Sequence, residues 1–156
     1  MDKIIIKQNP NGDTRTAPKD ITFGQFHTAN ISHINDVQRV MQELGDMVEA
    51  AGFRHDWTKI TYEQEFYDNF LDTINNGTDF VSNTWYQKHI KKERHHPFSY
   101  CHEDIDLLDI LETIVDCVCA GMARSGEVRP LEFNEEILKK AVENTVKMIR
   151  NMVEVQ

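Results

Sequence analysis

Three short segments of the chain carry side chains that could hold a metal ion. His55 and Asp56 are adjacent, His33 stands 22 positions earlier, and Asp116 is the only charged residue between Ile114 and Ala123. A carboxylate in such an apolar run is costly to bury unless a cation or several hydrogen bonds compensate its charge. Imidazole and carboxylate groups are common ligands of divalent cations. These residues therefore predict a metal site, provided that the folded chain brings them together.

The segment around His33 has the pattern of an amphipathic helix. Apolar residues recur at spacings of three and four over residues 34–51, Asn30 or Ser32 can act as the N-cap, and Gly52 offers a stop. At about 100° per residue, His33 projects along the apolar stripe, so we expect it to face the core from the first turn. A core histidine whose ring nitrogen is satisfied by a backbone carbonyl is the alternative for this position.

The same reasoning predicts four more helices. They begin near Thr61, Thr78, Glu103 and Asn134, and the first three end near Gly77, Pro97 and Arg124. His55 and Asp56 thus lie in the junction between two helices, where side chains can point into a shared cleft. Helical projection places Asp116 on the flank of its helix, where we expect it to be half-buried.

The first 17 residues have a different pattern. Residues 3–7 are rich in β-branched side chains, residues 9–13 are dense in turn formers, and residues 14–16 can return as a second strand. We therefore expect an all-α fold in a single domain over residues 1–156. It would comprise a short β-hairpin within 1–17 and a helical body of about five helices over 30–153.

Charge and composition restrict the partners. The formal net charge is -9, which argues against a binder of duplex nucleic acid, since such proteins need a basic face. A metal ion could still supply local positive charge for a small anionic substrate. No apolar run approaches the roughly 18 residues that a membrane helix needs. The three cysteines lack the spacing of a disulfide framework, so we expect reduced thiols in a cytoplasmic protein.

The order of these motifs resembles that of the HD-domain metal-dependent phosphohydrolases, in particular a small, poorly characterised phage and bacterial branch. The segment from His33 to Met41 looks like the first ligand helix of that superfamily, and His55-Asp56-Trp57-Thr58-Lys59 looks like its second-ligand turn, lysine included. The resemblance covers roughly residues 31–124, and it implies an HD-like helical bundle.

The resemblance also implies a ligand set. The first divalent ion (Mn, Fe, Ni, Zn or Mg) would be bound by His33, His55, Asp56 and Asp116. Asp56 would bridge to a second ion or orient the nucleophilic water, and Lys59 would stabilise charge on the phosphate. The second ion would be bound by His89, His95 and His96, although surface histidines at a polar helix end are the alternative. The implied substrate is a phosphate ester or anhydride, in particular that of a nucleotide.

Two other functions fit the sequence. One is a non-catalytic helical module that binds a metal, a nucleotide or a protein partner, and the sequence leaves a homo-oligomer open. The other is an all-α, magnesium-dependent nucleoside triphosphate pyrophosphohydrolase that uses the acidic flank of one helix, formed by Asp109, Glu112 and Asp116. This last function would be indifferent to the loss of His33 or His55.

Overall fold

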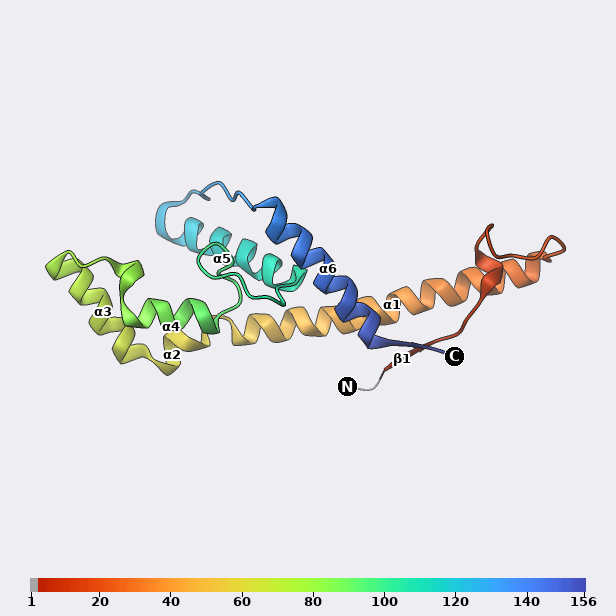
Figure 1. Cartoon of the computed structure of the whole chain (residues 1–156), viewed down its shortest axis with the longest axis horizontal. Coiled ribbons are helices and arrows are strands. Elements are labelled where there is room, and N and C mark those ends of the chain that lie inside the picture. The colour runs from red at the N-terminus through yellow and green to blue at the C-terminus, as the bar shows by residue number, and fades with distance from the viewer. Residues whose placement is uncertain (1–2) are drawn as a thin grey trace. The chain divides into compact units, whose positions relative to one another are not determined.

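The computed structural model describes residues 3–156 and is mainly helical (Figure 1). Its elements, in chain order, are strand β1 (Ile4–Ile6), helix α1 (Phe23–Arg54), helix α2 (Trp57–Thr61), helix α3 (Glu63–Asn76), helix α4 (Thr84–Lys92), helix α5 (Leu107–Ser125), helix α6 (Glu135–Met152) and strand β2 (Val153–Val155), with short 3-10 turns at Pro10–Gly12 and Phe80–Ser82. The prediction of an all-α protein with a short sheet is confirmed. The chain divides into two compact units, 1–48 with 146–156, and 49–145.

The sheet in the first unit joins β1 to the far end of the sequence. β1 pairs in parallel with β2, with Ile4 opposite Val153, and the ladder continues where the backbone N–H of Gln8 donates to Gln156 at 2.9 Å. The predicted strand at residues 3–7 is therefore confirmed, but the hairpin is wrong. Residues 14–16 form turns instead of a strand, because the β-branched segment at 153–155 supplies the partner.

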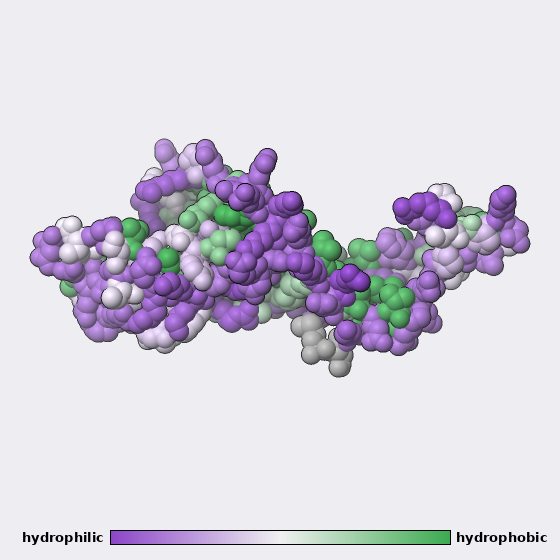
Figure 2. All heavy atoms as spheres, in the orientation of Figure 1, coloured by the Kyte–Doolittle hydropathy of each residue, from purple (hydrophilic) through white to green (hydrophobic). Residues whose placement is uncertain are grey.

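Helix α1 is longer than its apolar pattern predicts. It begins at Phe23 rather than near Asn30 and passes through Gly52 without stopping. A capping box explains the early start: the backbone N–H of Gln25 donates to Thr22 Oγ1 at 3.3 Å, and the Gln25 side chain accepts from the Thr22 N–H at 2.9 Å. Many apolar side chains of α1 remain exposed, and Figure 2 shows patches of hydrophobic residues between hydrophilic ones on the visible face.

In the second unit, aromatic stacking joins α3 to α4. The ring of Phe66 lies 3.9 Å from that of Trp85, which stacks in turn on the imidazole of His89 at 4.7 Å. Helix α3 ends as predicted at Gly77, whose φ of 68° suits glycine. Helix α4 begins six residues later than predicted, because the Asn83 side chain accepts from Tyr86 N–H and so forms the N-cap.

A small apolar core holds α5 against the first half of α6. It contains Ile105, Ile110 and Ala141, with Phe133 and Leu138 among the side chains packed on it. Both helices begin near their predicted starts. A capping box between Asp106 and Asp109 opens α5, and Asn134 caps α6. No helix within residues 3–156 is both long and apolar enough to cross a membrane.

Candidate metal centre

The His-Asp pair lies in the tight turn between α1 and α2. Asp56 has φ 57° and ψ 25°, the left-handed conformation, and it is the only non-glycine residue with positive φ among residues 3–156. Aspartate tolerates this conformation better than most residues, but at some cost in energy. Such a conformation at a charged, half-buried side chain is typical of functional sites. The turn directs both His55 and Asp56 toward α4 and α5, as their contacts show.

Helix α4 and the segment after it supply three imidazoles. His89 is on the last turn of α4, and His95 and His96 follow it. The ring of His95 lies 4.2 Å from that of His96 and 4.4 Å from that of His55. His89 and His95 are almost fully buried, so the alternative of surface histidines does not hold for them. The four rings form one cluster.

Helix α5 closes the cluster with two carboxylates one turn apart. Glu112 Oε1 lies 2.9 Å from His55 Nδ1 and 3.0 Å from His95 Nδ1. Because a carboxylate can only accept, the hydrogen bond to His55 places the proton of that ring on Nδ1 and leaves its Nε2 atom free to bind a cation. Asp116 Oδ1 lies 3.5 Å from His55 Nε2. The predicted half-buried position of Asp116 is confirmed, since its side chain is 25% exposed.

The Nε2 atoms converge on Asp56. Its Oδ1 lies 3.5 Å from His95 Nε2 and 3.6 Å from His89 Nε2, and its Oδ2 lies 3.3 Å from His55 Nε2. Two sets of side chains have ligand atoms within 4.8 Å of one another. They are Asp56, His89, His95 and His96, and His55, His95 and Asp116. His95 belongs to both sets, and Asp56 contacts members of each.

Several buried atoms in this cluster have no hydrogen-bond partner. They are Asp56 Oδ1 and both ring nitrogens of His95. His95 is close to Glu112 and Asp56, but these contacts do not have the alignment of hydrogen bonds. A buried polar atom without a partner costs about 1–3 kcal/mol. A cation between Asp56 and the imidazoles would satisfy Asp56 Oδ1 and His95 Nε2, so the donor set fits a divalent metal ion.

The charges of the cluster are strongly coupled. Burial opposes protonation of His95, but the neighbouring carboxylates Asp56 and Glu112 outweigh it and raise the pKa of His95 to about 9. Burial would raise the pKa of the Asp56 carboxyl, yet the imidazole of His95 and the ammonium of Lys59 hold that pKa well below its usual range. Glu112 follows the same pattern, with its pKa lowered by its two histidines. Without a metal, one protonated imidazole partly occupies the role of the cation.

His89 and His96 behave in the opposite way. Burial and the proximity of the other ring lower the pKa of His89 to about 3, and burial together with His95 lowers the pKa of His96 to about 4. Their Nε2 atoms are 2.8 Å apart. Both rings are therefore neutral at pH 7. Neutral imidazole is the form that binds a metal ion.

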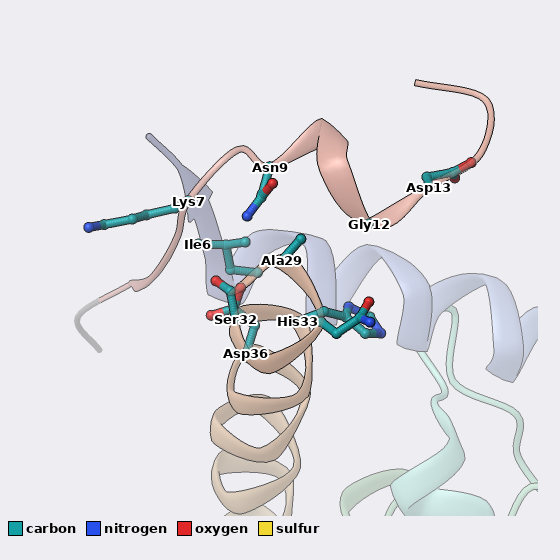
Figure 3. Close-up of a pocket in the computed structure, with 10 residues that line it drawn as sticks. Ile6, Lys7, Asn9, Gly12, Asp13, Ala29, Ser32, His33 and Asp36 are labelled. Atoms are coloured by element: carbon teal, nitrogen blue, oxygen red, sulfur yellow. The ribbon is translucent and has the colours of Figure 1, made fainter. Parts of the chain in front are cut away.

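His33 lies in the first unit, whereas all residues of the cluster lie in the second. His33 is exposed and lines a cavity of about 410 Å³ (Figure 3), whose other lining residues include Ser32, Asp36, Ile6, Lys7, Asn9, Gly12 and Asp13. The expectation that His33 faces the core is wrong, because the apolar side chains near it on α1 are themselves exposed. No turn interrupts α1 between His33 and Arg54.

The remaining candidates are placed as follows. Lys59 forms an ion pair with Asp56 Oδ2, so it lies at the candidate metal centre, as expected. Glu112 was predicted only as part of the acidic flank of a pyrophosphohydrolase. Its position four residues before Asp116 puts both side chains on one helical face. Asp109, the third member of that flank, is held by the guanidinium of Arg94 and by the capping box of α5. It is therefore engaged in fixing the helix start.

A family of unknown function, DUF5662, matches residues 23–155, a range that includes every residue of the cluster. The chain belongs to this family. No curated protein and no solved structure matches it.

Proposed function

We propose that this DUF5662 protein is a metal-dependent phosphohydrolase. The observation that carries the proposal is the convergence of four imidazoles and the Asp56 carboxylate around buried atoms that have no hydrogen-bond partner. The imidazole-rich donor set favours Fe, Ni or Zn, with Mn also acceptable, over Mg, which prefers oxygen ligands. A divalent ion bound there would lower the pKa of a water toward about 7 and withdraw charge from a phosphoryl oxygen.

The side chains of the cluster divide into ligands and supporting groups. His55, His95, Asp56 and Asp116 are the proposed ligands of one ion, and Asp56, His89 and His96 those of a second. Glu112 orients the ring of His55 by accepting from its Nδ1 atom, and the same carboxylate oxygen lies 3.0 Å from Nδ1 of His95. Lys59 neutralises Asp56 in the structure, and once a metal takes over that role its ammonium can bind a substrate phosphate. We propose a nucleotide as the substrate and the cytoplasm as the location.

The test combines metal analysis with hydrolysis assays. The purified protein is analysed by inductively coupled plasma mass spectrometry, and then incubated with bis(p-nitrophenyl) phosphate and a panel of nucleotides in the presence of Mn, Ni, Zn or Mg. The key variant is Asp56→Asn, because asparagine tolerates the left-handed backbone conformation but lacks the charge. We expect Asp56→Asn to lose metal and at least about 100-fold in turnover. His33→Ala, in the other unit, is the control and should match wild type.

Three outcomes contradict the proposal. Bound metal without turnover of any substrate would indicate a non-catalytic binding module. Magnesium-dependent pyrophosphate release that survives His55→Ala would indicate the pyrophosphohydrolase. Equal loss of metal in His33→Ala and Asp56→Asn would mean that the cluster of the second unit is not the complete site.

A further inference from the structure

A buried carboxylate, that of Glu93, lies next to the candidate metal centre but is not among its proposed ligands. Glu93 follows directly after α4 and is 4% exposed, and its partner Thr58 on α2 is fully buried. Glu93 Oε1 accepts from the backbone N–H of Thr58 at 2.9 Å and from the Thr58 hydroxyl at 2.6 Å. Burial of a carboxylate is costly, so the position of Glu93 beside Thr58 requires an explanation other than packing.

The hydrogen bonds of Thr58 determine which nitrogen of His89 carries the proton. The Thr58 hydroxyl has one hydrogen, which it donates to Glu93, so toward other groups it can only accept. His89 Nδ1 lies 2.6 Å from the Thr58 oxygen and must therefore carry the proton. The Nε2 atom of His89 is then left with a free electron pair, and it faces Asp56 Oδ1 and His96 Nε2.

We propose that Glu93 and Thr58 are positioning residues that fix the tautomer of His89 and direct its Nε2 to a metal ion. The indole of Trp85 stacks on the imidazole at 4.7 Å with an interplanar angle of 16°, which restrains the plane of the ring. The hydrogen-bond chain then sets which nitrogen is bare. This inference rests on the metal site of the proposed function and is independent of the reaction catalysed there.

The hydrogen bonds from Glu93 through Thr58 to His89 differ from the contacts that Glu112 makes with its two histidines. Glu112 contacts the Nδ1 atoms of two rings directly, whereas Glu93 reaches its ring through a hydroxyl. A hydroxyl alone could donate to the imidazole or accept from it. Glu93 removes that ambiguity, which is why removal of either member should weaken metal binding. Loss of such a supporting partner typically costs about 10–100-fold in metal affinity.

The experiment compares Thr58→Val with Thr58→Ser in the full chain. Valine has nearly the shape of threonine but cannot accept from His89, whereas serine keeps the hydroxyl. Zn²⁺ affinity is measured by competition with a chromophoric chelator, and Co²⁺ absorption spectra report the ligand geometry. We expect about 10–100-fold weaker binding for Thr58→Val and recovery to within about threefold for Thr58→Ser. Thr145→Val, another buried threonine outside the cluster, controls for loss of stability and should bind as wild type.

Nitrogen chemical shifts of the imidazoles in metal-free protein give a second readout. We expect His89 to be protonated at Nδ1 in wild type and to become a mixture of tautomers in Thr58→Val. Wild-type metal affinity in a folded Thr58→Val protein overturns the positioning role while leaving the metal site intact. If the wild-type protein binds no metal, the proposed function fails with it, and the chemical shifts alone decide whether the hydrogen-bond chain sets the tautomer. A proton on Nε2 in wild type refutes the chain as described.

Discussion

Replacement of Arg94 by methionine should destabilise the second unit substantially, because Arg94 holds a buried carboxylate. Its Nε and Nη2 donate to the two oxygens of Asp109 at 2.8 and 2.7 Å, and Nη1 donates to Asp104 at 2.9 Å. The Asp109 side chain is only 8% exposed, while that of Arg94 is 36% exposed. Methionine retains most of the length and apolar contact of arginine and removes the charge.

The expected size of the effect follows from this burial. Breaking a fully buried ion pair by removing one partner costs about 3–5 kcal/mol. Arg94 is partly exposed, and the backbone N–H of Asp106 still donates to Asp109 in the variant, so we expect the lower end, about 3 kcal/mol. For a chain of this size, that corresponds to a fall in Tm of roughly 6–12 °C. Asp109→Asn should cost less, since it keeps a capping acceptor and the partly exposed arginine still donates to Asp104.

Urea denaturation of the two single variants and of the double variant Arg94→Met/Asp109→Asn measures the coupling between the side chains. We expect a coupling energy of about 1–3 kcal/mol, with the double variant more stable than the sum of the single losses predicts. An additive double variant, or a change below about 0.5 kcal/mol in Arg94→Met, would refute the reasoning. His95 follows Arg94 in sequence, so Arg94→Met should also weaken metal binding when assayed well below its Tm.

Two further predictions concern stability. Because the pKa values of His89 and His96 are lowered to about 3 and about 4, respectively, these rings take up protons near pH 6.5 in the unfolded chain but only below about pH 4 in the metal-free folded chain. Its stability should therefore fall by about 1 kcal/mol per histidine between pH 6.5 and 5.5, which urea titrations would measure, and a flat profile would contradict the burial of these rings as neutral groups. Gly121→Ala should cost about 1–3 kcal/mol, because its Cβ would lie 2.6 Å from the backbone oxygen of Glu127. Gly45→Ala, which meets nothing within 4 Å, should be neutral or stabilising in the same thermal melts.

Periodicity and capping residues predicted the helices well where the signals were local. Gly77 and Asn134 mark helix ends in the structure as they do in the sequence. The early start of α1 was also encoded locally, in the capping box of Thr22 and Gln25, but the weak apolar pattern after it hid the signal. The pairing of β1 with β2 could not be predicted, because the partner lies about 150 residues away in sequence and no local rule selects it.

The candidate site was predicted in part. The His-Asp dipeptide and Asp116 come together as expected, and the histidines near the end of α4 join them. His33 was expected on the buried face of α1 and is exposed instead. The apolar spacing predicts which face of a helix is apolar, but not whether another element covers that face. The buried chain from Glu93 through Thr58 had no recognisable motif, since a glutamate after two lysines is typical of a solvated helix end.

The backbone conformation of Asp56 has an evolutionary consequence. Glycine and asparagine adopt a positive φ readily, so either could replace Asp56 without straining the backbone. Neither carries the negative charge that Asp56 places beside the imidazoles. In a deep mutational scan, protein abundance and selected activity should diverge sharply at this codon, with those two substitutions abundant but inactive. Under the proposed function, both substitutions would be compatible with the fold but not with metal binding, so glycine or asparagine at this position would mark relatives that lack the proposed activity.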